Sequence, residues 1–341
     1  PDLVPPHNYF GFSLWLRDVW GMDATVHYGK HGNLEWLPGK ALALSDGCYP
    51  EAVLGPIPHI YPFIVNDPGE GTQAKRRAQA IIIDHLTPPL TRAESYGPLA
   101  ELERLVDEYY EAAGVDPRRL KLLQGEILEL VATAGLDKDC GIEARDSSTA
   151  ALSKLDNYLC ELKELQIRDG LHVLGDSPEG EQLENLLVAL TRLPRGTDAD
   201  RTASLLRALA RDLEFADFDP LDCPMGDAWT GPRPQALASL PLATWRSQGD
   251  TVERLERLAL DLVAGRHAVA AHWSHTRAVL EEIEQHIRPA VAACGKAEVS
   301  SFLTALDGRF VDPGPSGAPT RGRVDVLPTG RNIYSVDSRV V

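Results

Sequence analysis

The spacing of apolar and polar positions divides the chain into regions of different character. In the first 95 residues, short apolar runs rich in β-branched and aromatic residues alternate with Gly and Pro, which is typical of strands joined by turns. The runs predict two strands, at 24–29 and 59–65. They also predict a short helix before the first strand, at 13–21, and a helix after the second, at 72–86. This order indicates an α/β layer with a short, mostly parallel sheet.

The middle of the chain has a helical period. From about residue 96, apolar residues recur every three and four positions, and this spacing predicts helices within 99–114, 117–135 and 152–175. A second helical block is predicted through 251–267, 275–295 and 298–308. The fold class is therefore α/β with a large helical insertion.

The last 35 residues are rich in Gly, Pro and Arg, carry no helical period and still contain aromatic and β-branched residues. Such a segment is typical of an ordered functional loop. We expect three parts: an α/β layer, a helical region and a loop that returns to the site, at 1–95, 96–305 and 306–341. The chain also lacks an initial methionine, and we expect it to be a fragment of a longer one.

Charge and composition exclude several classes of protein. The net charge of −16 would repel polyanions, so nucleic acid is not an expected partner. No apolar run approaches the roughly 20 residues that cross a bilayer, and the N-terminus lacks the pattern of a signal peptide, so no membrane association and a cytoplasmic location are expected. The five cysteines are scattered and form no CxxC pair, which disfavours a disulfide framework and a thiolate zinc site.

The first candidate site is formed by His27, His31 and Glu35, which are spaced four apart with glycines between them. On a helix this spacing would align all three, as in zinc proteases, but the glycines favour a strand followed by a tight turn close to a ligand. Imidazole and carboxylate groups suit a divalent metal, and either could act as a general base. The alternative is a core histidine beside a purely structural turn.

The second candidate is a Gly-rich acidic turn at 66–71, followed by a helix that carries Lys75, Arg76 and Arg77. The start of such a helix can hold an anion. The alternative is a capped helix with a basic, solvated face. No GxxxxGK[ST] motif occurs in the chain, so nucleotide hydrolysis by this chain is disfavoured.

The third candidate lies in the C-terminal loop, where Arg321, Arg323, Arg331 and Asn332 are spread among glycines. Guanidinium groups and exposed backbone N–H groups are suited to carboxylate recognition. The alternative is a flexible surface tail. A lone His172 beside Gly170, which we expect to end a helix, is interpreted as structural.

Taken together, four segments resemble the large subunit of the tetrapyrrole metal chelatases, the family that includes aerobic cobaltochelatase and magnesium chelatase. The resemblance covers nearly the whole chain and rests on motifs within 26–94, 158–175, 229–234 and 306–337. The motif HGNLEWLPGK at 31–40 is more similar to the cobalt branch, since the magnesium branch more often has HGSLEFMPGK.

The resemblance implies a function and partners. It implies that the chain binds a corrinoid, hydrogenobyrinic acid a,c-diamide, and inserts Co2+ into it during aerobic cobalamin synthesis. It also implies an AAA+ ATPase subunit and a companion subunit as partners, with ATP and Mg2+ on the partner. The absence of a nucleotide-binding motif here agrees with that division.

The resemblance also suggests roles for the candidate residues. His27, His31 and Glu35 would bind and deliver the metal, with Glu35 and His31 as the catalytic pair and Glu35 as the proton acceptor. Tyr28 and Trp36 would pack on the ring. The side chains expected to pair with peripheral carboxylates of the ring are those of Lys75, Arg76, Arg321, Arg323, Arg331 and Asn332.

Three alternatives remain from the sequence. The chain could belong to a magnesium chelatase, which inserts Mg2+ into protoporphyrin IX. It could be a non-catalytic module that binds tetrapyrrole or metal. It could also be a metallohydrolase built on the two histidines, which would require a third ligand and an open metal position.

Overall fold

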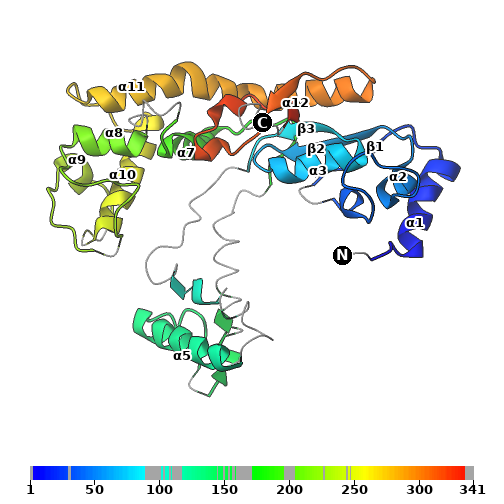
Figure 1. Cartoon of the computed structure of the whole chain (residues 1–341). Helices are drawn as coiled ribbons and strands as arrows, with labels where there is room; N and C mark the ends of the chain where they lie inside the picture. Colours follow the sequence, from blue (N-terminus) through cyan, green and yellow to red (C-terminus); the bar gives the residue numbers. More distant parts are fainter. Residues whose placement is uncertain are drawn as a thin grey trace.

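The computed structural model describes most of the chain, and Figure 1 labels its helices and strands. The described residues are 3–29, 32–88, 117–143, 171–195, 204–225, 227–242, 245 and 247–334, with parts of 101–109 and 145–158. His31 and most of the helices predicted within 99–114 and 152–175 lie outside them.

A five-stranded sheet combines the two ends of the chain, in the order β1-β2-β3-β5-β4. Its strands are β1 (Thr25–Val26), β2 (His59–Ile64), β3 (Ile81–His85), β4 (Pro313–Pro315) and β5 (Asn332–Tyr334). All neighbours are parallel except β3 and β5. The predicted short, mostly parallel sheet is confirmed, and the C-terminal loop contributes two of its strands.

The predicted helix at 72–86 is wrong in its second half. Helix α3 (Pro68–Ala78) ends at Gln79, whose φ of 51° is left-handed and stops the helix. The following residues 81–83 are three isoleucines, and these β-branched side chains favour the strand β3. The sequence-based prediction merged the helix and the strand because the period of a short apolar run does not distinguish a strand from the end of a helix.

Helices cover both faces of the sheet, with α3 on one side and α12 (Arg288–Leu306) on the other (Figure 1). The α3 face packs through the cluster Tyr61, Phe63, Ala74, Ile82 and Ile333. The α12 face packs through Ile60, Ile83, Phe302 and Ala305. The sheet is thus the middle layer of three.

The largest apolar core joins α12 to the other helices of the C-terminal half. These helices are α7 (Gly180–Arg192), α8 (Leu205–Asp212), α9 (Gln235–Ala238), α10 (Gln248–Val263) and α11 (Ser274–Glu282). A π-helical turn, η3 (Ile283–Ile287), joins α11 to α12 just before Pro289, which has no N–H to donate to the preceding turn. The predicted second helical block is confirmed.

Helix α5 (Pro117–Ala134) agrees with the predicted helix and packs in a separate apolar cluster that includes Leu123, Ile127 and Val131. Shorter elements near the sheet are α1 (His7–Leu14), η1 (Trp15–Trp20), η2 (Leu34–Trp36), α2 (Tyr49–Leu54), η4 (Pro319–Arg321) and η5 (Val324–Val326). No helix in the described part of the chain is long and apolar enough to span a bilayer.

Three glycines allow two loops to pack closely against the middle of α12. A Cβ on Gly295 would lie 2.6 Å from the carbonyl carbon of Gly175, and one on Gly330 would lie 2.5 Å from the carbonyl carbon of Ala297. Gly175 and Gly330 also have φ values of +93° and +90°, which favour glycine. The close approach therefore depends on the absence of side chains.

We expect Gly295→Ala to lower the free energy of unfolding by about 1–3 kcal/mol, because the new methyl group meets backbone that cannot rotate away. The matched variant is Gly125→Ala in α5, where a Cβ would meet no atom within 4 Å. It should raise the free energy of unfolding by about 0.5–1 kcal/mol, as alanine does in an open helix. Urea unfolding of both variants measures this, and equal effects would contradict the packing argument.

Candidate functional site

His27 and Tyr28 leave the end of β1 on opposite faces of the sheet. The register pairs Thr25 with His59, and the backbone N–H of His27 donates to the carbonyl of Ile60 at 3.0 Å. Because successive side chains of a strand alternate between faces, His27 lies on the α3 face with His59, and Tyr28 lies on the α12 face. The first sequence motif therefore places one side chain on each face of the sheet.

On the α3 face, His27, Glu35, His59 and Tyr61 form a polar cluster that we call the Glu35 cluster. The His27 ring lies edge-on to those of His59 and Tyr61, with centroids 4.7 and 5.5 Å away. Glu35 is fully buried in η2. A Cβ on Gly32 would lie 2.7 Å from a Glu35 carboxylate oxygen and 2.9 Å from the Tyr61 hydroxyl, so both groups converge on a point that only glycine leaves open.

Four buried polar atoms of the Glu35 cluster lack a hydrogen-bond partner among the described residues: His27 Nδ1, His59 Nε2 and both Glu35 carboxylate oxygens. The Nδ1 of His59 lies 2.9 Å from the carbonyl of Ala78, which can only accept, so Nδ1 carries the proton and Nε2 presents a lone pair. Each unpartnered group costs about 1–3 kcal/mol of folding free energy. Such a concentration indicates groups kept for a ligand or for proton transfer.

Burial determines the protonation of the Glu35 cluster. It raises the pKa of Glu35 and, together with the charge of Glu35, that of Tyr61. It lowers the pKa of His27 and lowers that of His59 to about 4. His59 is therefore neutral at pH 7, and Glu35 binds a proton more readily than an ordinary glutamate, as a general base requires.

Arg77 holds the backbone that carries Glu35. This buried residue of α3 donates to the carbonyls of Glu35 and Leu37, both at 2.7 Å, and of Lys40 at 3.0 Å. Its neighbour Arg76 is exposed. The basic run of the second motif thus has two roles, because one arginine supports the turn while the other faces solvent.

Lys75 and Asn332, which come from the second and third motifs, are in contact. Lys75 Nζ donates to the side-chain oxygen of Asn332, which also accepts the backbone N–H of Ile82 at 3.2 Å. Burial lowers the pKa of Lys75. The C-terminal loop is therefore joined to α3 beside the Glu35 cluster.

The three candidate arginines of the C-terminal loop differ in their surroundings. Arg321 is exposed at the end of η4. Arg323 is paired with Asp325 at 2.8 Å. Arg331 is half-buried, and its guanidinium is 3.5 Å from the carbonyl of Leu327. The proposed carboxylate-binding role of all three remains a prediction.

The two aromatic candidates for ring packing are accessible to solvent. The proposed metal ligands His27, His31 and Glu35 remain a prediction. Tyr28 and Trp36 are 59% and 52% exposed, so each could stack against a flat ligand. His31 lies outside the described residues. Within the described ranges, no group of three His, Cys, Asp or Glu side chains is arranged to hold a metal.

Asp84 on β3 is a second fully buried carboxylate. One of its oxygens accepts the backbone N–H of Arg331 at 2.6 Å, and the other has no hydrogen-bond partner in the described part of the chain. Burial raises the pKa of Asp84 to about 7. This carboxyl group therefore exchanges a proton near neutral pH.

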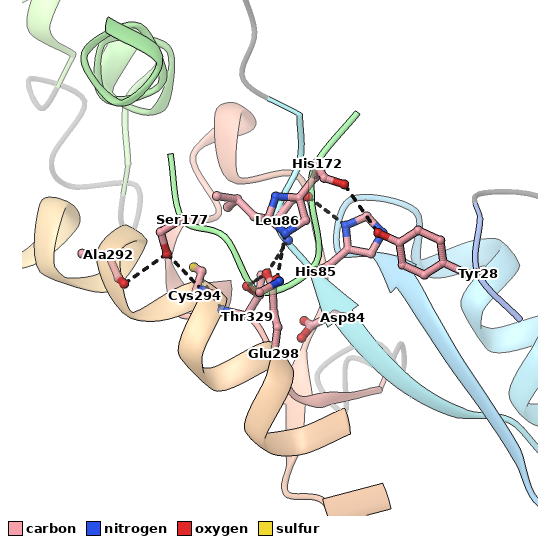
Figure 2. Close-up of polar contacts among 12 residues, drawn as sticks. Tyr28, Asp84, His85, Leu86, His172, Ser177, Ala292, Cys294, Glu298 and Thr329 are labelled. Carbon is pink, nitrogen blue, oxygen red and sulfur yellow. Dashed lines mark hydrogen bonds and ion pairs between the residues drawn. The ribbon is translucent and has the colours of Figure 1, made fainter. Parts of the chain in front are cut away.

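On the α12 face, His85, His172, Glu298 and Thr329 form a second polar group, the Glu298 cluster (Figure 2). His172 Nε2 lies 2.7 Å from one oxygen of Glu298, and the Thr329 hydroxyl donates to the other at 2.6 Å. The rings of His85 and His172 are stacked, with centroids 5.2 Å apart. The Tyr28 hydroxyl donates to the carbonyl of His172 at 3.5 Å. Tyr28, just beyond the end of β1, is therefore in contact with the Glu298 cluster.

Sequence reasoning missed His59, Tyr61 and Glu298. The first two were detectable, because polar side chains two apart in the strand 59–65 must share a face. Glu298 gave no local signal, since its partners come from distant segments. His172 has a firm partner in Glu298, as expected of a structural histidine.

A comparison with protein families matches residues 1–341 to the family described as CobN/Magnesium Chelatase. The chain belongs to this family. It is 63% identical to the aerobic cobaltochelatase subunit CobN of Sinorhizobium sp. and 56% identical to that of Pseudomonas aeruginosa, over 100% and 99% of this chain. The magnesium-chelatase subunit ChlH of Oryza sativa is 29% identical over 99% of this chain.

A solved structure agrees with this assignment. The catalytic subunit of cobaltochelatase from Mycobacterium tuberculosis superposes with a TM-score of 0.63 at 40% identity, covering 99% of this chain and 28% of that one. The chain likewise spans 28% and 27% of the two CobN relatives. It therefore corresponds to just over a quarter of their length.

Asp84→Asn should change how stability depends on pH. The pKa of Asp84 rises from 3.8 to about 7 on folding, so the folded state binds the proton more tightly. The free energy of unfolding then falls as the pH rises from about 4 to about 8, by at most about 4 kcal/mol from this residue. Asparagine keeps an oxygen that accepts the backbone N–H of Arg331 but does not titrate. The variant should therefore show a smaller decrease in the free energy of unfolding over this pH range.

Urea unfolding at pH 5 and pH 8 measures the effect. The control is Asp307→Asn, because the Asp307 side chain is 67% exposed in its surface ion pair with Arg309 and should leave the pH dependence unchanged. Parallel pH profiles for wild type and Asp84→Asn would show that Asp84 does not titrate in this range.

Proposed function

We propose that this chain forms part of the metal-insertion site of an aerobic cobaltochelatase, with Glu35 as the proton acceptor. The observation that carries the proposal is the Glu35 cluster, a set of buried and unpartnered imidazole and carboxylate atoms in the segment 26–94, which resembles the tetrapyrrole metal chelatases. The chain is 63% and 56% identical to two cobaltochelatase subunits but 29% identical to the magnesium-chelatase subunit of rice. This difference supports cobalt over magnesium as the inserted metal.

Insertion of a divalent metal into a tetrapyrrole requires three events. Water must leave the ion, an inner N–H proton must leave the ring, and the ring must be held while the nitrogen lone pairs bind the metal. A buried carboxylate with a raised pKa suits the second event. Neutral imidazole and carboxylate groups suit the first, because they can replace water around Co2+.

In this proposal Glu35 takes the ring proton, and His27, His31 and Glu35 deliver the metal. The unpartnered Nδ1 of His27 supports its part. The nearby Nε2 of His59 adds a further unpartnered imidazole nitrogen to the Glu35 cluster. Arg77 donates to the carbonyl of Glu35 and so fixes the backbone that carries this carboxylate.

The ring would lie over the exposed edge of the sheet. Tyr28 and Trp36 are the exposed aromatic side chains of the first motif, and they could stack on it. Its peripheral carboxylates would meet the cationic and amide groups of Lys75, Arg76, Arg321, Arg323, Arg331 and Asn332. The contact between Lys75 and Asn332 supports a shared role for the second and third motifs.

The substrate would be the corrinoid hydrogenobyrinic acid a,c-diamide. The relatives are named as subunits, which supports a complex of several chains. We propose that an AAA+ ATPase subunit and its companion hydrolyse ATP with Mg2+ there, since this chain has no nucleotide-binding motif of the GxxxxGK[ST] type.

Glu35→Gln in the full-length subunit, assembled with its partners, should lower kcat for Co2+ insertion by about 100-fold or more. The amide keeps the shape of the side chain but cannot accept the proton. Binding of the metal-free corrinoid, followed by its absorbance, should change little.

The matched control is Glu281→Gln, an exposed carboxylate on α11 outside both clusters. It should leave kcat unchanged. If Glu35→Gln inserts Co2+ at the wild-type rate, Glu35 is not the base, and a non-catalytic tetrapyrrole-binding module becomes the better description of this region.

The choice between cobalt and magnesium can be tested by binding. The full-length subunit should bind metal-free corrinoid at least about tenfold more tightly than protoporphyrin IX, a difference of about 1.4 kcal/mol. Absorbance titration with each ring measures both dissociation constants. A preference for protoporphyrin would instead indicate a magnesium chelatase.

A further inference from the structure

Helix α1 and the π-helical turn η1 have one packed side and one open side. On the packed side, Phe10 lies edge-on to Tyr49 of α2, with ring centroids 5.7 Å apart. The Arg17 guanidinium donates to the carbonyl of Ala52, also in α2, at 3.3 Å. Figure 1 shows α1 at one end of the molecule beside α2. The opposite side of α1 and η1 faces solvent.

The open side is apolar and largely aromatic. It consists of Phe12, Trp15, Val19 and Trp20, which are between 44% and 73% exposed, and we call it the Trp15 surface. Trp15 and Trp20 are five residues apart, which is the separation of hydrogen-bonded residues in a π-helix, so η1 brings both rings to one side. Their centroids are 5.5 Å apart. The local backbone therefore groups two large aromatic side chains at the surface.

This composition is typical of a protein interface. Single apolar side chains are ordinary on a surface, but a contiguous aromatic group marks an interaction site or a liability to aggregate. Trp and Phe are enriched at the centre of interfaces, where charged side chains are depleted. Arg17 and Asp18 pair with each other at 2.8 Å, so their charges need no partner from outside. The Trp15 surface is thus suited to burial against another apolar surface.

The charges nearby disfavour a lipid membrane as the occupant. Helices that lie on a membrane carry several Lys or Arg side chains on their polar side, where they meet anionic headgroups. Within residues 7–23 the sequence has a single basic residue, Arg17, and it is paired with Asp18. The net charge of −16 adds repulsion from an anionic membrane.

Hydrophobicity and chain length separate the possible protein occupants. A transient partner would leave these aromatic side chains in water for much of the time, whereas permanent interfaces are the more hydrophobic class. The chain spans 28% and 27% of the two CobN relatives, so most of each relative lies outside the matched part. A segment of the same polypeptide is present at an effective concentration that reaches the millimolar range. Such a segment is therefore the occupant that these observations favour.

We infer that the Trp15 surface docks permanently against a part of the full-length subunit that lies outside this chain, and not against a second protein. The docking region presents apolar side chains and few charges to it. The packed side of α1 gives this contact a further consequence, because Phe10 packs against the cluster that contains Leu34 of η2. Docking at α1 therefore also supports the turn that carries Glu35.

Cysteine labelling of the full-length subunit tests the inference. Val19→Cys places a thiol of similar size on the Trp15 surface, and the rate of its reaction with a maleimide measures its access to solvent. In a dilute solution of the subunit alone, the reaction should be about 100-fold or more slower than after unfolding in urea, because the thiol reacts only when the docked region opens. The wild-type subunit gives the background from the native cysteines.

The matched control is Glu281→Cys on α11, where Glu281 and the nearby Glu284 are exposed. It should react within a few-fold of its rate in urea. Trp20→Glu, added to Val19→Cys, should raise the labelling rate about tenfold or more, because an unpaired carboxylate opposes burial. Trp20→Phe stays aromatic and should keep most of the protection. Circular dichroism establishes that each variant is folded.

Several results would overturn the inference. Labelling of Val19→Cys as fast as that of Glu281→Cys would show an open surface, and protection that grows with subunit concentration would show a second copy as the occupant. Protection that appears only on addition of the ATPase and companion subunits, or of vesicles of phosphatidylcholine and phosphatidylglycerol, would assign the surface to those partners. Equal labelling with Trp20→Glu and Trp20→Phe would show that docking does not shield the thiol. Labelling requires no metal insertion, so its result is independent of the proposed role of Glu35.

Discussion

The hydrogen bonds of the buried Glu298 carboxylate hold together the segments around the carboxyl end of β3. Its hydrogen bonds join the end of β3, the loop that contains His172 and Gly175, and the C-terminal segment at Thr329 to the middle of α12. These segments are separated by up to 243 positions in the sequence, from Leu86 to Thr329. Removal of one partner from a buried ion is expensive, so the segments are held as a unit. The glycines that pack against α12 allow the loops to reach this one side chain.

The end of β1 divides the chemistry between the faces of the sheet. Consecutive residues His27 and Tyr28 belong to the Glu35 cluster and to the surroundings of the Glu298 cluster, and the pleat of the strand separates them. One short strand thereby relates an unpartnered acid–imidazole group on the α3 face to a preorganised imidazole on the α12 face.

Local patterns predicted part of this arrangement. The strands at β1 and β2, the helix α5 and the second helical block have clear periods or turn residues, and the sequence predicts them. The strand β3 was merged with α3 because three isoleucines suit either element when they are buried. Arg77 and Glu298 could not be assigned, since a charge in a helix is usually solvated and only the folded chain brings carbonyl groups or donors around it. The candidate Glu35 was found because glycines mark a close approach.

In the proposed function the Glu35 cluster supplies the proton acceptor, but it adds little to the stability of the fold. Its four unpartnered atoms oppose folding, while Arg77 and the apolar layers supply the support. An apolar residue of similar volume at position 35 would therefore be compatible with the scaffold, and a search for greater thermal stability would select it early. Under the proposed function, stability and activity make opposite demands on this turn. A redesign of the subunit for thermal stability would then need to leave position 35 unchanged in order to keep the proposed proton acceptor.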